Sequence, residues 1–216
     1  MTTPIFITGT DTDIGKTFIS ALLIEAWGCN YWKPIQTGLD SDPGDTFTIK
    51  KLLEQSLGVP KTTTIFQPQL EYMKPLSPWR CTILENKPSI NIEELKFPAT
   101  KDNLTGSKYT IVEGAGGILV PINKTSYTTD IIKHLDASVI IVARSELGTL
   151  NHTLMTVEIL KQNKIPILGV ILNGDINNDN ALTLSELNVK IIAQIPKANS
   201  LKDVVDLVPA LETILS

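Results

Sequence analysis

The sequence predicts an α/β fold in which helices cover both faces of a parallel sheet. Short runs rich in Ile and Val recur along the chain, and each is followed by a turn that contains glycine and then by a segment with helical periodicity. Continuous apolar strands are typical of parallel sheets, whose strands are buried on both sides. Their alternation with helices indicates a layered α/β arrangement. With 42% hydrophobic residues, the chain 1–216 is expected to form a single domain.

The elements follow from these runs in order. The first strand is the apolar run at 4–8, and the first helix follows at 18–27, where apolar residues recur at spacings of three and four. Further strands are predicted at 29–33, 109–113, 139–143, 167–172 and 190–194. Further helices are predicted at 46–57, which Gly58 and Pro60 end, at 150–161 and at 201–215.

The stretch 59–107 breaks this rhythm. It contains prolines at 60, 68, 75, 78, 88 and 98 and only short periodic pieces. Proline lacks the N–H group that a helix interior or a central strand needs. We therefore expect an irregular excursion of the same domain, with one or two short helices.

Composition and charge exclude several classes of protein. The chain has 19 Lys and Arg against 23 Asp and Glu, a net charge of −4, whereas nucleic-acid-binding domains usually carry a basic surplus. Cys29 and Cys81 are too few for a disulfide scaffold and are expected to pack in a reducing compartment. The N-terminal residues do not resemble a signal peptide. The apolar runs are about five residues long, against the ~20 that span a bilayer. We expect a cytoplasmic protein with no membrane and no nucleic-acid partner.

The clearest motif is the segment 9–17, G-T-D-T-D-I-G-K-T, between the first strand and the first helix. This is the context of a P-loop, in which backbone N–H groups and a helix N-terminus bind nucleotide phosphates. Gly15 allows close approach, Lys16 is expected to reach the β- and γ-phosphates, and the Thr17 hydroxyl to ligate Mg²⁺. The N–H groups are those of Thr12, Asp13, Ile14, Gly15, Lys16, Thr17 and Phe18. The expected fold is therefore that of the P-loop NTPases.

Other P-loop classes fit the sequence less well. The loop has five residues between its glycines, where the common pattern has four. A GTPase should offer an N-K-x-D element to read guanine, but the segment that begins with Asn163 and Lys164 lacks the Asp. ParA- and MinD-like ATPases carry a signature lysine five residues before the loop lysine, and that position is Asp11 here.

Acidic residues that could hold Mg²⁺ lie next to two predicted elements. Glu113 closes the strand at 109–113 and precedes a glycine-rich run, 114–117, whose N–H groups could also reach phosphate oxygens. Asp45 stands just before the second helix, and Asp40 and Asp42 compete with it for the same role. Each of these acids could instead cap a helix or be a solvated charge.

Lys33 lies in the segment Y-W-K-P-I-Q-T-G, just after the second strand. Its position predicts a place at the carboxyl edge of the sheet, where ligands of α/β proteins bind. A lysine there can neutralise a transferring phosphoryl group or a substrate carboxylate. The alternative is an exposed lysine of a loop.

Taken together, G-T-D-T-D-I-G-K-T, Y-W-K-P-I-Q-T-G, V-E-G-A-G-G and the later L-G-T-L-N-H resemble the dethiobiotin synthetase family of biotin biosynthesis. The resemblance runs from residue 6 to about 198, and the five-residue spacing of the loop glycines is usual in that family. It implies an Mg²⁺-dependent ligase that converts 7,8-diaminononanoate, CO₂ and ATP to dethiobiotin, ADP and phosphate. One amine would capture CO₂ as a carbamate, which attacks the γ-phosphoryl group, and the second amine would close the ring.

The resemblance also assigns roles to individual residues. Lys16 and Lys33 would be the catalytic lysines, and Thr17, Asp45 and Glu113 would ligate Mg²⁺. The nucleotide would also contact Gly114, Ala115, Gly116, Asn173, Gly174, Pro196, Lys197 and Ala198. The diamine would contact Thr37, Gly117 and Ile118, and its carboxylate would bind the helix start formed by Gly148, Thr149, Leu150 and Asn151. In the family this last corner comes from a neighbouring subunit, so a homodimer is implied. Without the family, Asn173 reads equally as a turn residue, and Thr149 or Asn151 as a helix cap.

The chain departs from the family pattern in two places. The run from Lys16 to Lys33 is about one helical turn shorter, so the first helix must turn sharply at Gly28. Trp79 stands where the S-P-H segment of the family has histidine. His134 and His152 lie in helical segments and are expected to be surface or packing residues.

Two other functions remain open from the sequence. The V-E-G-A-G-G motif also occurs in relatives of cobyrinate amidotransferase, so a related amidotransferase-type ligase is one alternative. Such ligases usually carry a glutaminase domain, for which 216 residues leave little room. The other alternative is an ATPase switch of the ParA or MinD type, against which Asp11 argues.

Overall fold

The computed structural model describes residues 2–98 and 106–215. Six of the strands in these residues form one sheet: β1 (Thr3–Gly9), β2 (Asn30–Trp32), β5 (Tyr109–Gly117), β6 (Ser138–Arg144), β7 (Ile167–Asn173) and β8 (Ile191–Ile195). The strand order is β2-β5-β1-β6-β7-β8, and each neighbouring pair is parallel. The parallel α/β architecture predicted from the sequence is confirmed.

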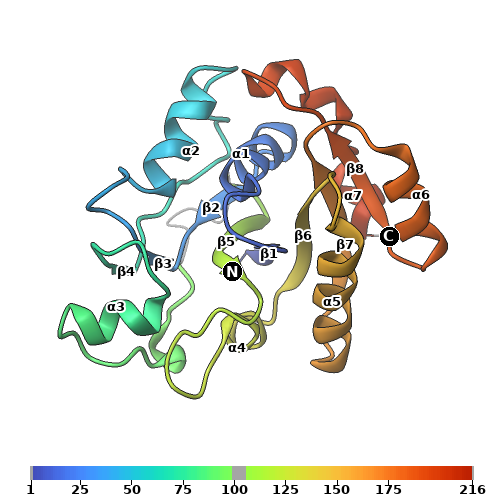
Figure 1. Ribbon diagram of the computed structural model, residues 1–216. Helices are drawn as coiled ribbons and strands as arrows, with labels where there is room; N and C mark the ends of the chain where they lie inside the picture. Colours follow the sequence, from blue (N-terminus) through green and yellow to red (C-terminus); the bar gives the residue numbers. More distant parts are fainter. Residues whose placement is uncertain (1, 99–105, 216) are drawn as a thin grey trace.

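Helices cover both faces of the sheet (Figure 1). They include α1 (Lys16–Trp27), α2 (Asp45–Glu54), α4 (Thr128–His134), α5 (Thr149–Gln162), α6 (Asn178–Glu186) and α7 (Leu211–Leu215). Successive side chains of a strand point to opposite faces. Ile5 and Ile7 of β1 accordingly pack with α1 and α2, whereas Phe6 between them packs with α4 and α5. This alternation explains why the strands read as continuous apolar runs.

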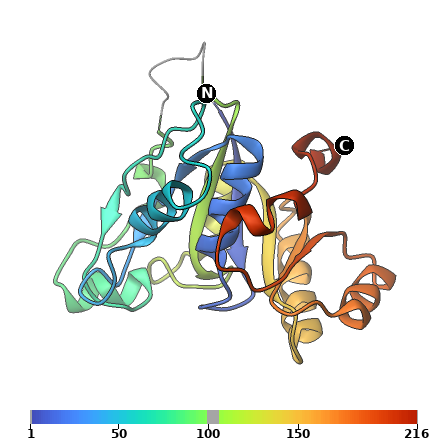
Figure 2. The ribbon, with the colours of Figure 1, turned by 90° about the horizontal axis from the view of Figure 1, so that it is seen from above.

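The strand order reverses around β1, which lies between β5 and β6. In open α/β sheets, ligands bind beyond the carboxyl ends of the strands at such a reversal. The loop 9–17 leaves the end of β1 and runs into α1. Figure 2 shows α1 over the middle of the sheet, with α2 on one side of it and the C-terminal segment on the other. The topology therefore places the predicted phosphate loop at the centre of the sheet edge.

The first helix ends where the sequence predicts. Gly28 adopts the left-handed conformation at φ 63°, and its N–H donates to the carbonyl of Ile24 at 2.8 Å. Glycine takes this conformation without the steric penalty of a Cβ, so it commonly ends a helix. The sharp turn brings the chain directly into β2 and, at its end, to Lys33.

The excursion 59–107 contains short elements. Its described residues form β4 (Leu70–Glu71), the helix α3 (Pro78–Leu84) and a 3₁₀ turn at Ile92–Glu94. β4 pairs in parallel with β3 (Ile35–Gln36), apart from the main sheet. Residues 99–105 of the predicted excursion lie outside the described residues.

The closing helix predicted at 201–215 is wrong. The segment forms 3₁₀ turns at Leu201–Asp203 and Val205–Leu207 before α7 begins at Leu211. Pro209 lies between the last turn and α7, and proline cannot continue a helix because it lacks an N–H and clashes with the preceding turn. These turns bury the regularly spaced apolar residues without a continuous helix, since Leu201, Val204 and Leu211 all belong to the core cluster that includes the buried side of α1.

Smaller differences concern helix α2 and two helices that the sequence did not predict. α2 covers Asp45–Glu54 rather than 46–57, and its end turns back through a bond from the N–H of Gly58 to the carbonyl of Leu53. α4 has seven residues, too few to show a helical period, and α6 has one buried residue, Leu184, so its apolar periodicity is weak. Cys29 and Cys81 are buried free thiols, as expected. Within the described residues, each helix is too short or too polar to cross a membrane.

Candidate functional site

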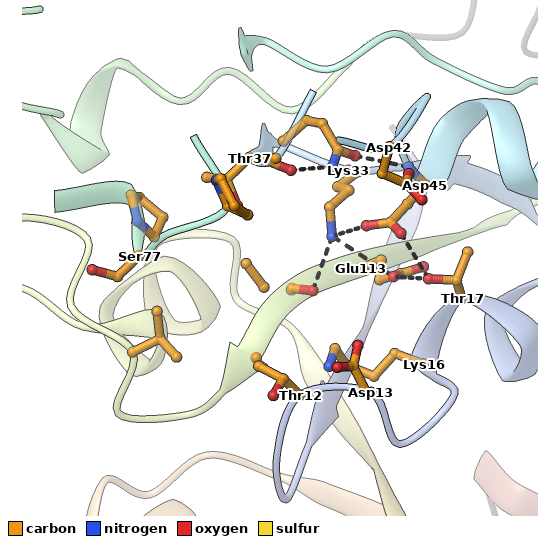
Figure 3. A pocket seen from close by; sticks show the side chains of 18 of the residues that line it. Thr12, Asp13, Lys16, Thr17, Lys33, Thr37, Asp42, Asp45, Ser77 and Glu113 are labelled. Atoms are coloured by element: carbon orange, nitrogen blue, oxygen red, sulfur yellow. Dashed lines mark hydrogen bonds and ion pairs between the residues drawn. The ribbon is translucent and has the colours of Figure 1, made fainter. Parts of the chain in front are cut away.

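A cavity of about 910 Å³ opens at the carboxyl ends of the central strands. It is lined by the loop after β1, the segment after β2, residues 75–78 and the end of β5 (Figure 3). The predicted site residues that line it are Thr12, Asp13, Gly15, Lys16, Thr17, Lys33, Thr37, Asp45, Glu113, Gly114, Ala115 and Gly116. Residues from four separate parts of the chain therefore meet around one space.

The loop at the N-terminus of α1 depends on glycine. Gly15, the residue before the helix, has φ 84°, and a Cβ there would collide with the side-chain amide of Asn173. The Asn173 amide donates to the carbonyl of Ile14 at 2.8 Å and so ties the loop to the end of β7. Gly15, Lys16 and Thr17 line the cavity at the start of this twelve-residue helix, and the first N–H groups of a helix have no partner within the helix. The motif predicts that an anion binds at this helix start.

Asp11 and Arg144 hold the outer side of the loop. The Asp11 carboxylate accepts from the N–H of Thr12 at 2.8 Å and from the Arg144 guanidinium at 2.9 Å. The Lys16 ammonium donates to the Asp11 carbonyl at 3.1 Å. Asp11 thus fastens the loop to the end of β6, which gives a structural reason for an acid at this position.

The floor of the cavity is a cluster of four charged or hydroxyl side chains (Figure 3). The Lys33 ammonium lies 2.6 Å from Asp45 Oδ2 and 3.7 Å from Glu113 Oε1, and it donates to the carbonyl of Gly114 at 3.1 Å. The Thr17 hydroxyl lies 2.9 Å from Asp45 Oδ1 and 2.8 Å from Glu113 Oε1. Lys33 is 3% exposed and Glu113 1%, so Lys33 is not an exposed loop lysine.

Burial and the neighbouring charges perturb the cluster. Burial raises the pKa of Glu113, although the Lys33 ammonium opposes this shift. Burial would also raise the pKa of Asp45, but Lys33 and the hydrogen bonds from Lys33 and Thr17 outweigh it and lower that pKa. For Lys33, burial is outweighed by the two carboxylates, which raise its pKa. Lys16 has its pKa lowered chiefly by burial. Perturbed groups gathered in a cleft are typical of functional sites.

The oxygens of Thr17, Asp45 and Glu113 fit a divalent cation. A hydroxyl carries one proton, yet that of Thr17 lies within hydrogen-bond distance of two carboxylates. Either a proton on Glu113 or a cation held by the three oxygens satisfies the second contact. In the described part of the chain, no group of three or more His, Cys, Asp and Glu side chains gathers as a metal site. Two carboxylates and a hydroxyl, completed by phosphate and water, are the donor set of Mg²⁺.

The structure distinguishes among the competing acids. Asp45 bonds both Thr17 and Lys33, whereas Asp42 lines the cavity and accepts from the N–H of Gly44 at 2.7 Å. Asp40 does not line the cavity. The sequence reasoning also missed Gln36, whose side chain accepts from the N–H of Asp45 at 2.9 Å and so fixes the start of α2.

Tyr31 is a second contributor that the sequence reasoning missed. Its hydroxyl donates to Glu113 Oε2 at 3.1 Å, and its side chain is fully buried. Burial, with the nearby charges of Glu113 and Asp45, raises its pKa well above the ordinary value, so the hydroxyl keeps its proton. The only sequence signal is an aromatic residue two positions before Lys33.

Several predicted residues lie outside this cavity. They are Ile14, Phe18, Gly117, Ile118, Gly148, Thr149, Leu150, Asn151, Asn173, Gly174, Pro196, Lys197 and Ala198. Asn173 lies behind the loop, and the N–H of Gly174 next to it bonds the end of β8 at Ile195. The Lys197 ammonium, on the loop after β8, lies 3.8 Å from Glu146 and 3.6 Å from Asp175. Thr149 is fully buried at the start of α5.

Trp79 and the histidines do not line the cavity. Trp79 lies in α3, and its backbone N–H donates to the carbonyl of Pro121 at 3.3 Å. Ser77 and Pro78, just before it, do line the cavity. A ring nitrogen of His134 lies 2.9 Å from the carbonyl of Leu95. His152 lies in the first part of α5.

Known sequences resemble nearly the whole chain. Residues 3–205 match the family described as the AAA domain. The ATP-dependent dethiobiotin synthetase BioD of Paramagnetospirillum magneticum is 40% identical over 192 residues, which cover 88% of this chain and 86% of that protein. The protein of the same name from Endomicrobium trichonymphae is 40% identical over 92% of this chain and 90% of its own length. The biotin biosynthesis bifunctional protein BioCD of Bordetella avium is 40% identical over 98% of this chain, which spans 44% of that longer protein.

Solved structures resemble the fold. The cell division ATPase MinD of Pyrococcus furiosus has a TM-score of 0.55 at 17% identity and covers 92% of this chain and 84% of its own. The MinD of Pyrococcus horikoshii complexed with Mg-ADP has a TM-score of 0.53 at 18% identity, over 98% of this chain and 88% of its own. The expected likeness to P-loop NTPases is confirmed as a likeness of fold.

Proposed function

The chain belongs to the family of ATP-dependent dethiobiotin synthetases, and on this premise we propose that it joins CO₂ to 7,8-diaminononanoate and closes the ring of dethiobiotin at the expense of ATP. One amine nitrogen attacks CO₂ and loses a proton, which gives a carbamate. A carbamate oxygen then attacks the γ-phosphorus of ATP as the bond to the bridging oxygen of ADP breaks. The second amine attacks the carbonyl carbon of this mixed anhydride, phosphate leaves, and the cyclic urea forms.

One observation carries the proposal: a single cavity joins the phosphate loop to Lys33 and Thr37, with the carboxylates of Asp45 and Glu113 between them. A reaction that transfers a phosphoryl group to a carbamate needs both substrates in one space and in line. In this proposal the triphosphate would lie along the phosphate loop, and the second substrate would lie beside Lys33 and Thr37 in the same cavity.

On the nucleotide side, we assign the triphosphate to the N–H groups of residues 12–18 and to the ammonium of Lys16. Thr17, Asp45 and Glu113 would hold Mg²⁺, and Gly114, Ala115 and Gly116 would extend the backbone donors. The chemistry that Mg²⁺ supplies in such a site is neutralisation of charge on the phosphate oxygens. Lys16 would exchange its bond to the Asp11 carbonyl, 3.1 Å long, for a bond to phosphate.

On the substrate side, Lys33 is the group that we assign to the reacting atoms. It is a buried cation whose charge the carboxylates stabilise, so it can donate to carbamate and phosphoryl oxygens as negative charge develops. Thr37 on the same wall of the cavity would orient an amine through its hydroxyl. Gly117 and Ile118 would line the way to the carboxylate end of the diamine.

Two further parts of the assignment, like Gly117 and Ile118, lie beyond this cavity. The adenine would contact Asn173, Gly174 and the segment 196–198, which border the back of the loop. The substrate carboxylate would bind Gly148, Thr149, Leu150 and Asn151 of a second copy of the chain. The support for this anion site is the start of a fourteen-residue helix with Gly148 at φ 93°. We therefore propose a homodimer. We also propose that the protein acts in the cytoplasm, with no membrane or nucleic-acid partner.

Phosphate release from MgATP tests the proposal. The rate is expected to depend on 7,8-diaminononanoate and bicarbonate together, and to fall to background when either is left out. Turnover without the diamine would instead favour an ATPase switch of the ParA or MinD type. Turnover with another carboxylate and an amine donor would favour an amidotransferase-type ligase.

A further inference from the structure

The two carboxylate oxygens of Glu113 have different surroundings. Oε1 lies 2.8 Å from the Thr17 hydroxyl and 3.7 Å from the Lys33 ammonium, at the cavity floor. Oε2 accepts from the Tyr31 hydroxyl at 3.1 Å, on the side away from the cavity. Tyr31 itself does not line the cavity. The Tyr31 hydroxyl therefore holds Oε2, while Oε1 faces Thr17 and Lys33; a hydrogen bond from the Ser20 side chain also acts on this carboxylate and lowers its pKa.

The position of Tyr31 follows from strand pairing. Tyr31 of β2 pairs with Ile111 of β5, and Glu113 is two residues further along β5, on the same face of the sheet. A long side chain reaches such a diagonal neighbour across a strand pair. Lys33 follows β2 directly, two residues beyond Tyr31, and its ammonium forms the 3.7 Å ion pair with Oε1, so this segment places one polar group near each oxygen of Glu113.

The backbone of Tyr31 is fixed on its other side as well. Its N–H donates to the carbonyl of Thr64 and its carbonyl accepts from the N–H of Phe66, both at 2.9 Å. Tyr31 forms a parallel bridge with Ile65 there. Its side chain is 0% exposed and belongs to the same apolar core cluster as the buried residues of α1. The hydroxyl therefore has little freedom to leave Glu113.

We propose that Tyr31 is a positioning residue for the divalent cation: its hydroxyl fixes Glu113 so that Oε1 alone faces Thr17 and Asp45. The inference rests on the proposed function, because Glu113 is there a ligand of the cation. A partner that orients a ligating carboxylate typically changes metal affinity when it is removed. A tyrosine that merely filled the core would act through its ring, which phenylalanine keeps.

The test is Tyr31→Phe, with Tyr72→Phe as the matched control. Tyr72 is also buried, at 3% exposed, and does not line the cavity. The dissociation constant of Mn²⁺ from the protein saturated with ADP is measured by electron paramagnetic resonance. The dissociation constant of ADP is measured by calorimetry in EDTA. We expect Tyr31→Phe to weaken Mn²⁺ binding roughly 10-fold while ADP affinity in EDTA and the Tyr72→Phe protein stay unchanged.

Each other outcome overturns the inference. Mn²⁺ affinity equal to that of the unaltered protein would show that the hydroxyl does not position Glu113. Parallel losses of Mn²⁺ affinity and of ADP affinity in EDTA would show a general structural role. If the unaltered protein with ADP bound no Mn²⁺, the assignment of the cation site in the proposed function would itself fail, and that result is distinct from the first two.

Discussion

Replacing the buried lysine of the cavity floor has a calculable consequence. Lys33→Met keeps an unbranched side chain that is one heavy atom shorter, but removes an ammonium 2.6 Å from Asp45 Oδ2 and 3.7 Å from Glu113 Oε1. The two carboxylates would then keep the Thr17 hydroxyl between them, and Glu113 would keep the Tyr31 hydroxyl on Oε2, but the ammonium that pairs with both would be lost. Removing one partner of a buried ion pair costs about 3–5 kcal/mol. The Asp45 side chain is 29% exposed, so we take the lower end, about 3 kcal/mol.

Thermal unfolding in EDTA measures this cost. For a chain of this size 1 kcal/mol shifts the melting temperature by roughly 2–4 °C, so Lys33→Met should melt roughly 6–12 °C lower. The control is Lys133→Met, which removes an exposed ion pair at 3.7 Å to Asp130 and should change stability by less than about 0.5 kcal/mol. If both variants melted alike, the claim that Lys33 neutralises the carboxylates would be refuted. The proposed role in catalysis adds that Lys33→Met should lose ATP-dependent turnover even at temperatures where it is folded.

Three further predictions concern the loop, the cation and the thiols. Gly15→Ala should abolish tight ATP binding in calorimetry because of its collision behind the loop, whereas Gly58→Ala, with a similar φ of 87° and open space around it, should bind normally; equal binding would contradict the loop geometry. Thr17→Val should lose the increase in ADP affinity that Mg²⁺ provides but retain affinity in EDTA, and an unchanged Mg²⁺ effect would remove Thr17 from the cation site. Burial raises the pKa of Cys29 to about 12 and also raises that of Cys81. Because only about one Cys29 thiol in ten thousand is ionised at pH 8, neither thiol should react with Ellman's reagent until the protein unfolds, and rapid reaction of one equivalent in the folded protein would contradict the burial.

The parts of the fold that the sequence predicts well are set by local patterns. β1, the glycine loop and α1 follow one another without interruption, and the residues of each segment are enough to predict its conformation. Gly28 marks the end of α1 because only a left-handed residue makes that turn. The closing helix failed for the opposite reason. Apolar residues at helical spacing were read as continuous, although Pro209 stops a helix and separate turns bury the same side chains.

The site shows the same division. The loop residues and Lys33 were predictable because they follow strands in a parallel sheet, whose carboxyl ends meet at one edge. The choice of Asp45 over Asp42 was not predictable from the residues alone, since it depends on which acid the start of α2 turns toward Thr17. Tyr31 was missed because its role arises from the pairing of β2 with β5, and no pattern in the sequence reports that register.

The central claim is that one cavity couples phosphoryl transfer to closure of a urea ring. The most direct measurement supplies ¹³C-bicarbonate, 7,8-diaminononanoate and MgATP, and counts phosphate released against ¹³C-labelled dethiobiotin by mass spectrometry. We expect one phosphate for each labelled ring, with no phosphate when the diamine is absent. Phosphate released without a labelled ring would contradict the coupling and, with it, the proposed function of this site.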